Sequence, residues 1–147
     1  MKVLFVCTGN TCRSPMLEFA FKHYLFSLGI TDIEVDSAGI LNRKKLTAQN
    51  AITVLKAHSI PCVKRASKFC SEHEIGTADI VITSTVEQAE VLQKLYGRNG
   101  GKIVSVQTIA GYDIPDPFGE GIEAYEKTYE LINKALPKIL NYIKSRR

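Results

Sequence analysis

Residues 2–15 have the sequence KVLFVCTGNTCRSP, and this stretch decides the fold. The short, largely apolar run Lys2–Val6 predicts a buried parallel strand. A helix is predicted after it over Met16–Leu28, because Pro15 suits a first helical turn and Gly29 ends the apolar pattern. A strand that leads through a tight loop into a helix is the first unit expected of a parallel α/β fold.

The loop between the predicted strand and helix, with the residues that flank it, is suited to binding an anion. Loops of this kind point their backbone N–H groups inward at a helix N-terminus, and we call residues 7–14 the cradle for that reason. Cys7 lies at its base and Arg13 at its far end. Gly9 and Asn10 tolerate positive φ, and the Ser14 hydroxyl can donate to Cys7. Because thiols attack as thiolates and the cradle favours an anion, we predict that Cys7 attacks a phosphoryl group.

Strand and helix patterns alternate along the rest of the chain. Short apolar runs predict strands at residues 33–36, 78–83 and 102–106. Periodic apolar residues predict helices at residues 48–58, 86–96 and 122–145, with Thr47 as the N-cap of the first of these. This alternation is typical of a parallel sheet covered by helices, which makes the predicted fold class α/β.

Composition predicts an ordinary globular protein. The 147 residues, of which 45% are hydrophobic and 23% charged, are expected to form a single domain, residues 1–147. No apolar stretch approaches the roughly 18 residues of a membrane helix or the h-region of about 7–15 residues of a signal peptide. We therefore expect a cytoplasmic location and no membrane partner. The net charge of +4 is mild; it aids capture of a phosphate without calling for nucleic acid. The basic run Arg43–Lys45 is interpreted as a solvated loop.

The cysteine pattern favours free thiols. Without a secretory signal, four cysteines in a chain of this size do not indicate a disulfide framework. They also lack the close paired spacing of a zinc site, so neither a metal nor another cofactor is expected. Cys62 and Cys70 are interpreted as inert core or surface thiols.

Three separated motifs resemble those of the low-molecular-weight protein tyrosine phosphatases. They are VCTGNTCRSP at residues 6–15, DSAG at residues 36–39 and DPF at residues 116–118. Length and element order also agree with that family, so the resemblance covers essentially the whole chain. It implies a three-layer fold with a four-stranded parallel sheet in the strand order 2-1-3-4. Ligands of such sheets bind beyond the C-terminal strand ends, where Cys7 and the loop of residues 112–119 are both expected.

The resemblance also implies a mechanism. The leaving group needs a proton, and Asp113 and Asp116 are both candidates by position. The family carries its general acid in the Asp-Pro motif, which favours Asp116. The implied course is a phosphocysteine on Cys7, held by Arg13 and hydrolysed by water with Asp116 as the base. The residues expected to bind the substrate are Thr8, Gly9, Asn10, Thr11, Cys12, Ser14 and Phe118.

Three of these side chains have more specific expectations. Asn10 is expected to lock the loop through bonds to neighbouring backbone, as the family implies. Cys12 is either a small residue buried under the loop or the partner that captures an oxidised Cys7 as a disulfide. Relatives specific for phosphotyrosine commonly carry an aliphatic residue where this chain has Thr11. The sequences Thr-Cys-Arg-Ser-Pro and Asp-Pro-Phe-Gly, the latter including Phe118, are instead similar to the bacterial protein-arginine phosphatases.

We therefore expect a phosphorylated protein as substrate, with phosphotyrosine and phosphoarginine as competing candidates and phosphate or vanadate as active-site anions. Two segments depart from the family pattern and border the pocket in the family, residues 40–46 and 83–85. A thiol-dependent arsenate reductase of the same fold is an alternative, but residues 80–92 lack the further cysteines that it needs. A non-catalytic anion-binding module is another, although Cys7, Arg13 and Asp116 are all present.

Overall fold

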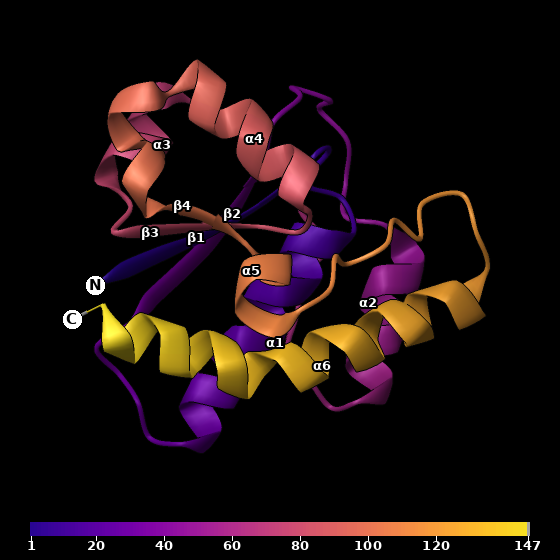
Figure 1. Cartoon of the computed structure of the whole chain (residues 1–147). Coiled ribbons are helices and arrows are strands. Elements are labelled where there is room, and N and C mark those ends of the chain that lie inside the picture. Colours follow the sequence, from indigo (N-terminus) through magenta and orange to yellow (C-terminus); the bar gives the residue numbers. More distant parts are fainter. Residues whose placement is uncertain (147) are drawn as a thin grey trace.

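The computed structural model describes residues 1–146, so Arg147, the last residue of the predicted domain, lies outside the described residues. The centre of the structure is a four-stranded parallel sheet (Figure 1). The strands are β1 (Lys2–Cys7), β2 (Glu34–Gly39), β3 (Ile80–Thr83) and β4 (Ile103–Ser105). Their order in the sheet is β2-β1-β3-β4, which confirms the predicted strand order.

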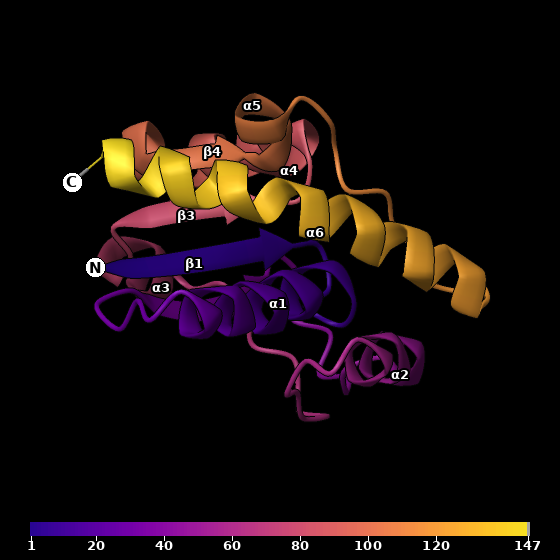
Figure 2. The same ribbon diagram turned by 90° about the horizontal axis from the view of Figure 1, so that it is seen from below.

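Helices cover both faces of the sheet. They are α1 (Arg13–Ser27), α2 (Gln49–Ala57), α3 (Glu72–Thr77), α4 (Val86–Leu95), α5 (Val106–Ala110) and α6 (Ile122–Ser145), with a 3₁₀ helix at Gly97–Lys102. In Figure 1, α3 and α4 lie on one face and α1, α5 and α6 on the other. Figure 2 shows α1 and α6 side by side on the second face, where they contact each other.

The alternation of side chains along β1 divides the core into two parts. Val3 and Phe5 pack with residues of α1, α2 and α6, whereas Leu4 and Val6 pack with residues of α3 and α4. Successive side chains of a strand point to opposite faces, so a fully apolar β1 requires helices on both sides. All four side chains are fully buried, which makes β1 the rigid support of the loop that follows it.

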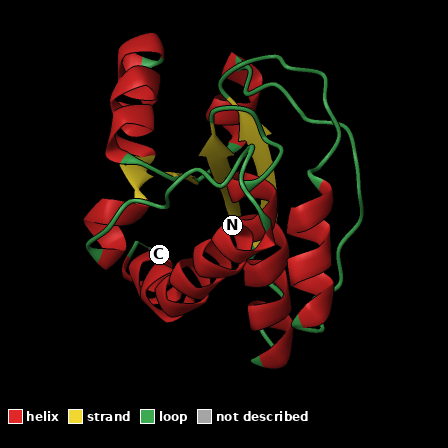
Figure 3. Cartoon of the chain, turned by 90° about the vertical axis from the view of Figure 1, so that its right-hand side faces the viewer, coloured by secondary structure: helices red, strands yellow, loops and turns green. Residues whose placement is uncertain are grey.

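Loops gather at the C-terminal edge of the strands, the side that faces the viewer in Figure 3. Cys7 pairs with Gly39 and Val6 pairs with Thr83, so three strands reach this edge together. The cradle, the segment after β2 and the loop before α6 all start or end here. This edge is therefore where the predicted site residues can meet.

Several elements differ from the predictions. Helix α1 begins at Arg13 rather than Met16, and the short helices α3 and α5 were not predicted. Thr47 was wrongly predicted as a helix cap: Ala48 is the N-cap of α2. The Thr47 hydroxyl instead donates to the Arg65 carbonyl and accepts from its N–H, both at 3.2 Å. Within residues 1–146, we find no helix with both the length and the apolar character needed to cross a membrane.

Candidate active site

The cradle is folded around the sulfur of Cys7. Asn10 has a φ of 55°, a left-handed conformation that asparagine tolerates better than most residues. This turn directs the Asn10 N–H at Cys7 Sγ over 3.2 Å, and Ser14 Oγ lies 3.1 Å from the same atom. The predicted contact between Ser14 and Cys7 is thus present. Cys7 is only 3% exposed, so the sulfur is held at the floor of the site by polar groups.

Asn10 fixes the cradle from behind, although not through the predicted partners. Its Nδ2 donates to Ser14 Oγ at 2.8 Å and to Ser37 Oγ at 3.0 Å. Its Oδ1 accepts from the backbone N–H of Lys68 at 2.9 Å. The expected bonds to neighbouring backbone are therefore replaced by bonds to two hydroxyls and to a distant backbone group. With both ends of its amide bonded, Asn10 ties the loop to β2 and to the segment before α3.

Gly39 allows β2 to approach the cradle closely. A Cβ at this position would lie 2.9 Å from the carbonyl carbon of Gly9 and 3.0 Å from the nitrogen of Asn10. Side chains do not tolerate such separations from backbone, so the last residue of the DSAG motif must be glycine here. The contact continues beyond it, because the Ile40 N–H donates to the Cys7 carbonyl at 3.0 Å.

Arg13, near the end of the cradle, reaches the segment that carries Asp116. Arg13 is 7% exposed, and its Nη1 donates to the Ile114 carbonyl at 3.1 Å. Its Nη2 lies 3.8 Å from Asp116 Oδ2. The Asp116 side chain is half-exposed, and its Oδ1 accepts from the N–H of Phe118 at 3.0 Å. The guanidinium and the carboxylate therefore share one space above Cys7.

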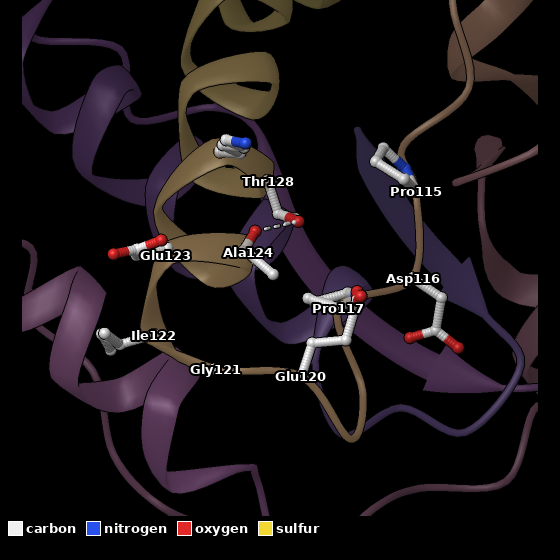
Figure 4. Close-up of a pocket in the computed structure, with 10 residues that line it drawn as sticks. Pro115, Asp116, Pro117, Glu120, Gly121, Ile122, Glu123, Ala124 and Thr128 are labelled. Atoms are coloured by element: carbon white, nitrogen blue, oxygen red, sulfur yellow. Dashed lines mark hydrogen bonds between the residues drawn. The ribbon is translucent and has the colours of Figure 1, made fainter.

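The structure places Asp113 and Asp116, the two candidates for the proton donor, in different surroundings. Asp113 Oδ1 accepts from the N–H of Val86 at 3.0 Å and so contacts the first residue of α4. Asp116 instead lines the pocket that contains Cys7. In Figure 4, Asp116 lies on the segment that leads into α6, and its carboxylate points away from Ala124 and Thr128 of that helix. A second hollow, of about 600 Å³, lies on the helix side of this segment.

The pocket above Cys7 is small, with a volume of about 110 Å³. Eight of the predicted site residues line it: Cys7, Thr8, Gly9, Thr11, Cys12, Arg13, Asp116 and Phe118. Asn10 and Ser14 do not line it and act from behind, as described above. Two further lining residues were not predicted, Arg43 and Lys45. They are exposed, as a solvated loop should be, and they belong to residues 40–46, which the resemblance placed at the border of the pocket without assigning a role to either side chain. We call Arg43, Lys45 and Phe118 the rim.

Behind the cradle lies a group of polar side chains that sequence reasoning missed. Ser37 Oγ, which accepts from Asn10, donates to Glu18 Oε1 at 2.6 Å. The Arg65 guanidinium donates to both oxygens of Glu18 and, at 2.9 Å, to Ser37 Oγ. We call Asn10, Ser14, Ser37, Glu18 and Arg65 the buried network. The spacing of Glu18 and Lys22, which pair at i,i+4, was the signal available in the sequence, but it does not reveal the longer connection.

The charge of Glu18 is stabilised by its partners. Burial by itself raises the pKa of this carboxyl, because its side chain has no exposed surface. Hydrogen bonds from Arg65, Lys22 and Ser37 outweigh that effect, and the net pKa of Glu18 is lowered. The buried network therefore holds a carboxylate that is charged at neutral pH.

The segment after β3 supports the cradle in a different way. Thr85 forms a capping box with Gln88 at the start of α4. The Nε2 of Gln88 also donates to Thr8 Oγ1 at 3.1 Å, a contact that the sequence did not indicate. Thr8 is thereby linked to α4 on the side of the cradle opposite to β2.

The other cysteines lie in less polar surroundings. Cys12 Sγ lies 3.3 Å from the hydroxyl of Tyr125, and burial raises the pKa of the Cys12 thiol. Burial also raises the pKa of Cys62, and that of Cys70 to about 12. Neither Cys62 nor Cys70 lines the pocket, which argues against the relay of thiols that an arsenate reductase needs. Among residues 1–146, no cluster of His, Cys, Asp and Glu is suited to hold a metal ion.

Comparisons with known proteins agree with this geometry. The family model "Low molecular weight phosphotyrosine protein phosphatase" matches residues 2–147. A protein-arginine-phosphatase of Bacillus subtilis is 30% identical, with 100% of this chain and 99% of the relative aligned. The low molecular weight protein-tyrosine-phosphatase PtpB of Staphylococcus haemolyticus is 32% identical, over 95% of this chain and 97% of that protein.

Two solved structures are similar over almost their whole length. The low molecular weight protein tyrosine phosphatase from T. tengcongensis superposes with a TM-score of 0.90 at 34% identity, over 97% of this chain and 99% of that one. The C7S mutant of YwlE arginine phosphatase, with a phosphorylated active site serine, superposes with a TM-score of 0.88 at 29% identity, over 98% and 96% of the two chains.

Proposed function

The chain belongs to the low molecular weight phosphotyrosine protein phosphatase family, and we propose that it hydrolyses phosphorylated protein side chains through a phosphocysteine intermediate on Cys7. The observation that carries this proposal is the convergence of five groups around one small pocket. The Cys7 sulfur lies at its floor, contacted by the Asn10 N–H and the Ser14 hydroxyl, with Arg13 and Asp116 above it.

In the first step, Cys7 Sγ attacks the phosphorus and the bond from phosphorus to the leaving oxygen or nitrogen breaks. Arg13 and the inward N–H groups of the cradle stabilise the negative charge on the phosphoryl oxygens. Asp116 gives its proton to the departing atom. The products of this step are the dephosphorylated side chain and a phosphocysteine. The relative with a phosphorylated active site serine supports this assignment of the nucleophile.

In the second step, water attacks the phosphorus and the S–P bond breaks. Asp116, now a carboxylate, takes a proton from the water, and inorganic phosphate and the Cys7 thiolate are released. The step regenerates the starting enzyme with its proton on Asp116. We extend the proposal to a single phosphatase domain that acts in the cytoplasm on proteins, with phosphate and vanadate as active-site anions.

Phosphotyrosine and phosphoarginine remain the two candidate substrates. Relatives of both descriptions align along nearly the whole chain. Thr11 and Phe118 both line the pocket and are the side chains through which a phenol or a guanidinium is distinguished. Because Thr11 presents a hydroxyl where an aliphatic side chain would favour a phenol, we treat it as the selector, which a substitution tests below.

Turnover of para-nitrophenyl phosphate tests the proposal. We expect vanadate-sensitive hydrolysis by the unmodified protein and a loss of at least about 10⁴-fold in Cys7→Ser, because a serine hydroxyl is a far weaker nucleophile than the thiolate. Cys62→Ser is the matched control, since it removes a thiol outside the pocket. Equal turnover by Cys7→Ser and the unmodified protein would contradict the proposal.

A further inference from the structure

The segment of residues 40–46 is anchored at both ends, to the cradle at one and to Ala66 at the other. The Leu41 N–H donates to the Thr8 carbonyl at 2.9 Å. At the other end, Leu46 forms an isolated antiparallel bridge with Ala66. The backbone therefore places the side chains of this segment at a defined position over the pocket.

Arg43 and Lys45 project from this segment to the mouth of the pocket. The stem of Arg43 lies over the cradle backbone, because its Cδ would be 3.3 Å from a Cβ built on Gly9. Lys45 Nζ lies 5.6 Å from the centroid of the Phe118 ring, which forms the facing wall. Lys44, the residue between them, does not line the pocket. Two cations thus approach the mouth from one side.

These two cations differ from the other basic groups near the site. Arg65 pairs with Glu18, and Lys68 pairs with Asp36. In the part of the chain that the structure describes, neither Arg43 nor Lys45 forms an ion pair with a carboxylate. Unpaired positive charge at the entrance of a pocket attracts an anionic group from its ligand.

We propose that Arg43 and Lys45 select protein substrates in which an acidic side chain lies next to the phosphorylated residue. This inference rests on the proposed function, since the phosphoryl group itself is assigned to Arg13 and the N–H groups of the cradle. A pocket of about 110 Å³ accepts the phosphorylated side chain alone, so cations at its mouth face the residues that flank that side chain. A flanking Asp or Glu supplies the carboxylate that these cations lack within the protein.

The preference is measured with matched peptides. Two phosphotyrosine peptides differ only in having Glu or Gln on each side of the phosphorylated residue, and a phosphoarginine pair follows the same design. Exposed ion pairs have modest strengths, so we expect kcat/KM to be roughly three- to tenfold higher for the Glu peptide of the series that is turned over. The ratio falls as ionic strength rises, because salt screens exposed charges.

Two variants locate the effect. In the double variant Arg43→Gln with Lys45→Gln, the ratio of kcat/KM between the Glu and Gln peptides falls to about one. Lys44→Gln is the control for position, since it removes one positive charge from the residue between them, which does not line the pocket, and it keeps the preference. Equal kcat/KM for both peptides in the unmodified protein overturns the proposal. So does an equal loss on both peptides in the double variant, which would place these cations on the phosphoryl group itself.

Binding separates this inference from the proposed function. The affinities of a Cys7→Ala protein, which has no nucleophile at this position, for the same peptides report recognition without chemistry. Tighter binding of the Glu peptide without any turnover by the unmodified protein supports the preference and contradicts the hydrolysis. Turnover with equal kcat/KM and equal affinities supports the hydrolysis and contradicts the preference. Equal affinities together with no turnover contradict both.

Discussion

The buried network supports the pocket from behind and the rim lies at its mouth, and the two regions differ in how their polar groups are satisfied. In the buried network, the Glu18 carboxylate and the Asn10 amide are bonded on both sides and shielded from solvent. At the rim, Phe118 is 53% exposed, and Arg43 and Lys45 have no carboxylate partner among residues 1–146. The groups that position Cys7, the proposed nucleophile, are thus fixed, whereas the groups that we propose to meet the substrate are left available.

This difference has a physical reason. Phosphoryl transfer depends on donors that are already in place when charge develops, so the sulfur and its donors need a rigid support. Recognition of a flexible substrate needs groups whose charge is still unpaired. Substitutions in the buried network should therefore change stability, whereas substitutions at the rim should change substrate recognition.

Asp116→Asn should have the largest effect on the chemistry short of removing the nucleophile. We expect kcat to fall by about 10²- to 10⁴-fold on a phosphotyrosine peptide, because the departing oxygen then lacks its proton donor. The loss should be smaller on para-nitrophenyl phosphate, whose leaving group needs a proton less. Steady-state kinetics with both substrates measures the difference.

Asp113→Asn is the matched control for this prediction, because its side chain contacts the start of α4 and does not line the pocket. It should keep kcat within a few-fold. A large loss in Asp113→Asn, with Asp116→Asn active, would exchange the roles of the two residues.

Glu18→Gln tests how much the buried network contributes to the stability of the protein. Removing the carboxylate leaves Arg65 without its partner, and we expect the free energy of unfolding to fall by about 2–3 kcal/mol. Lys45→Gln, at the rim, should change it by no more than about 0.5 kcal/mol. Denaturant titration of both variants compares them. Equal losses of unfolding free energy in the two variants would mean that the buried network contributes no more to stability than the rim.

The pH dependence of stability tests the charge of Glu18 in the buried network. Because the pKa of Glu18 is lowered in the folded state, its stabilising effect is complete above the unfolded value, about 4.3. It is lost as the pH falls through the lower, folded value. Thermal unfolding followed from neutral to acidic pH should therefore show a smaller acid destabilisation in Glu18→Gln than in the unmodified protein. An identical pH profile would contradict the charged state assigned to Glu18.

Substitution of Thr11 should have the smallest effect, a change in the preference between phosphotyrosine and phosphoarginine. Thr11→Ile replaces a hydroxyl by apolar surface and should shift the ratio of kcat/KM between phosphotyrosine and phosphoarginine peptides toward phosphotyrosine, by about tenfold. Thr11→Val keeps the volume and removes only the hydroxyl, so it separates polarity from size. An unchanged ratio in both variants would show that Thr11 is not the selector.

The parts of the site that the sequence predicted are those formed by neighbouring residues. Cys7, Arg13 and Ser14 meet because β1 runs directly into α1 through a short loop. The resemblance to a known family then supplied the strand order and Asp116, which local patterns alone could not. Helices α3 and α5 were missed because an element of five or six residues is too short to show helical periodicity.

The parts that the sequence did not predict depend on contacts between distant segments. The partners of Asn10 include Ser37 and Lys68, 27 and 58 residues away. Thr47 resembles a helix cap locally, but its hydroxyl is used by Arg65. Arg43 and Lys45 belong to a basic run that has the composition of a solvated loop. Only their place after the DSAG motif, a segment that borders the pocket in the family, could have indicated their position.

The most direct test of the central claim is the chemical trapping of the intermediate. The unmodified protein is mixed with substrate, denatured within the turnover time, and mapped by mass spectrometry for the residue that carries phosphate. We predict a phosphocysteine at Cys7, and none at Cys12, Cys62 or Cys70. Full turnover without phosphate on Cys7, or with phosphate on another side chain, would contradict it.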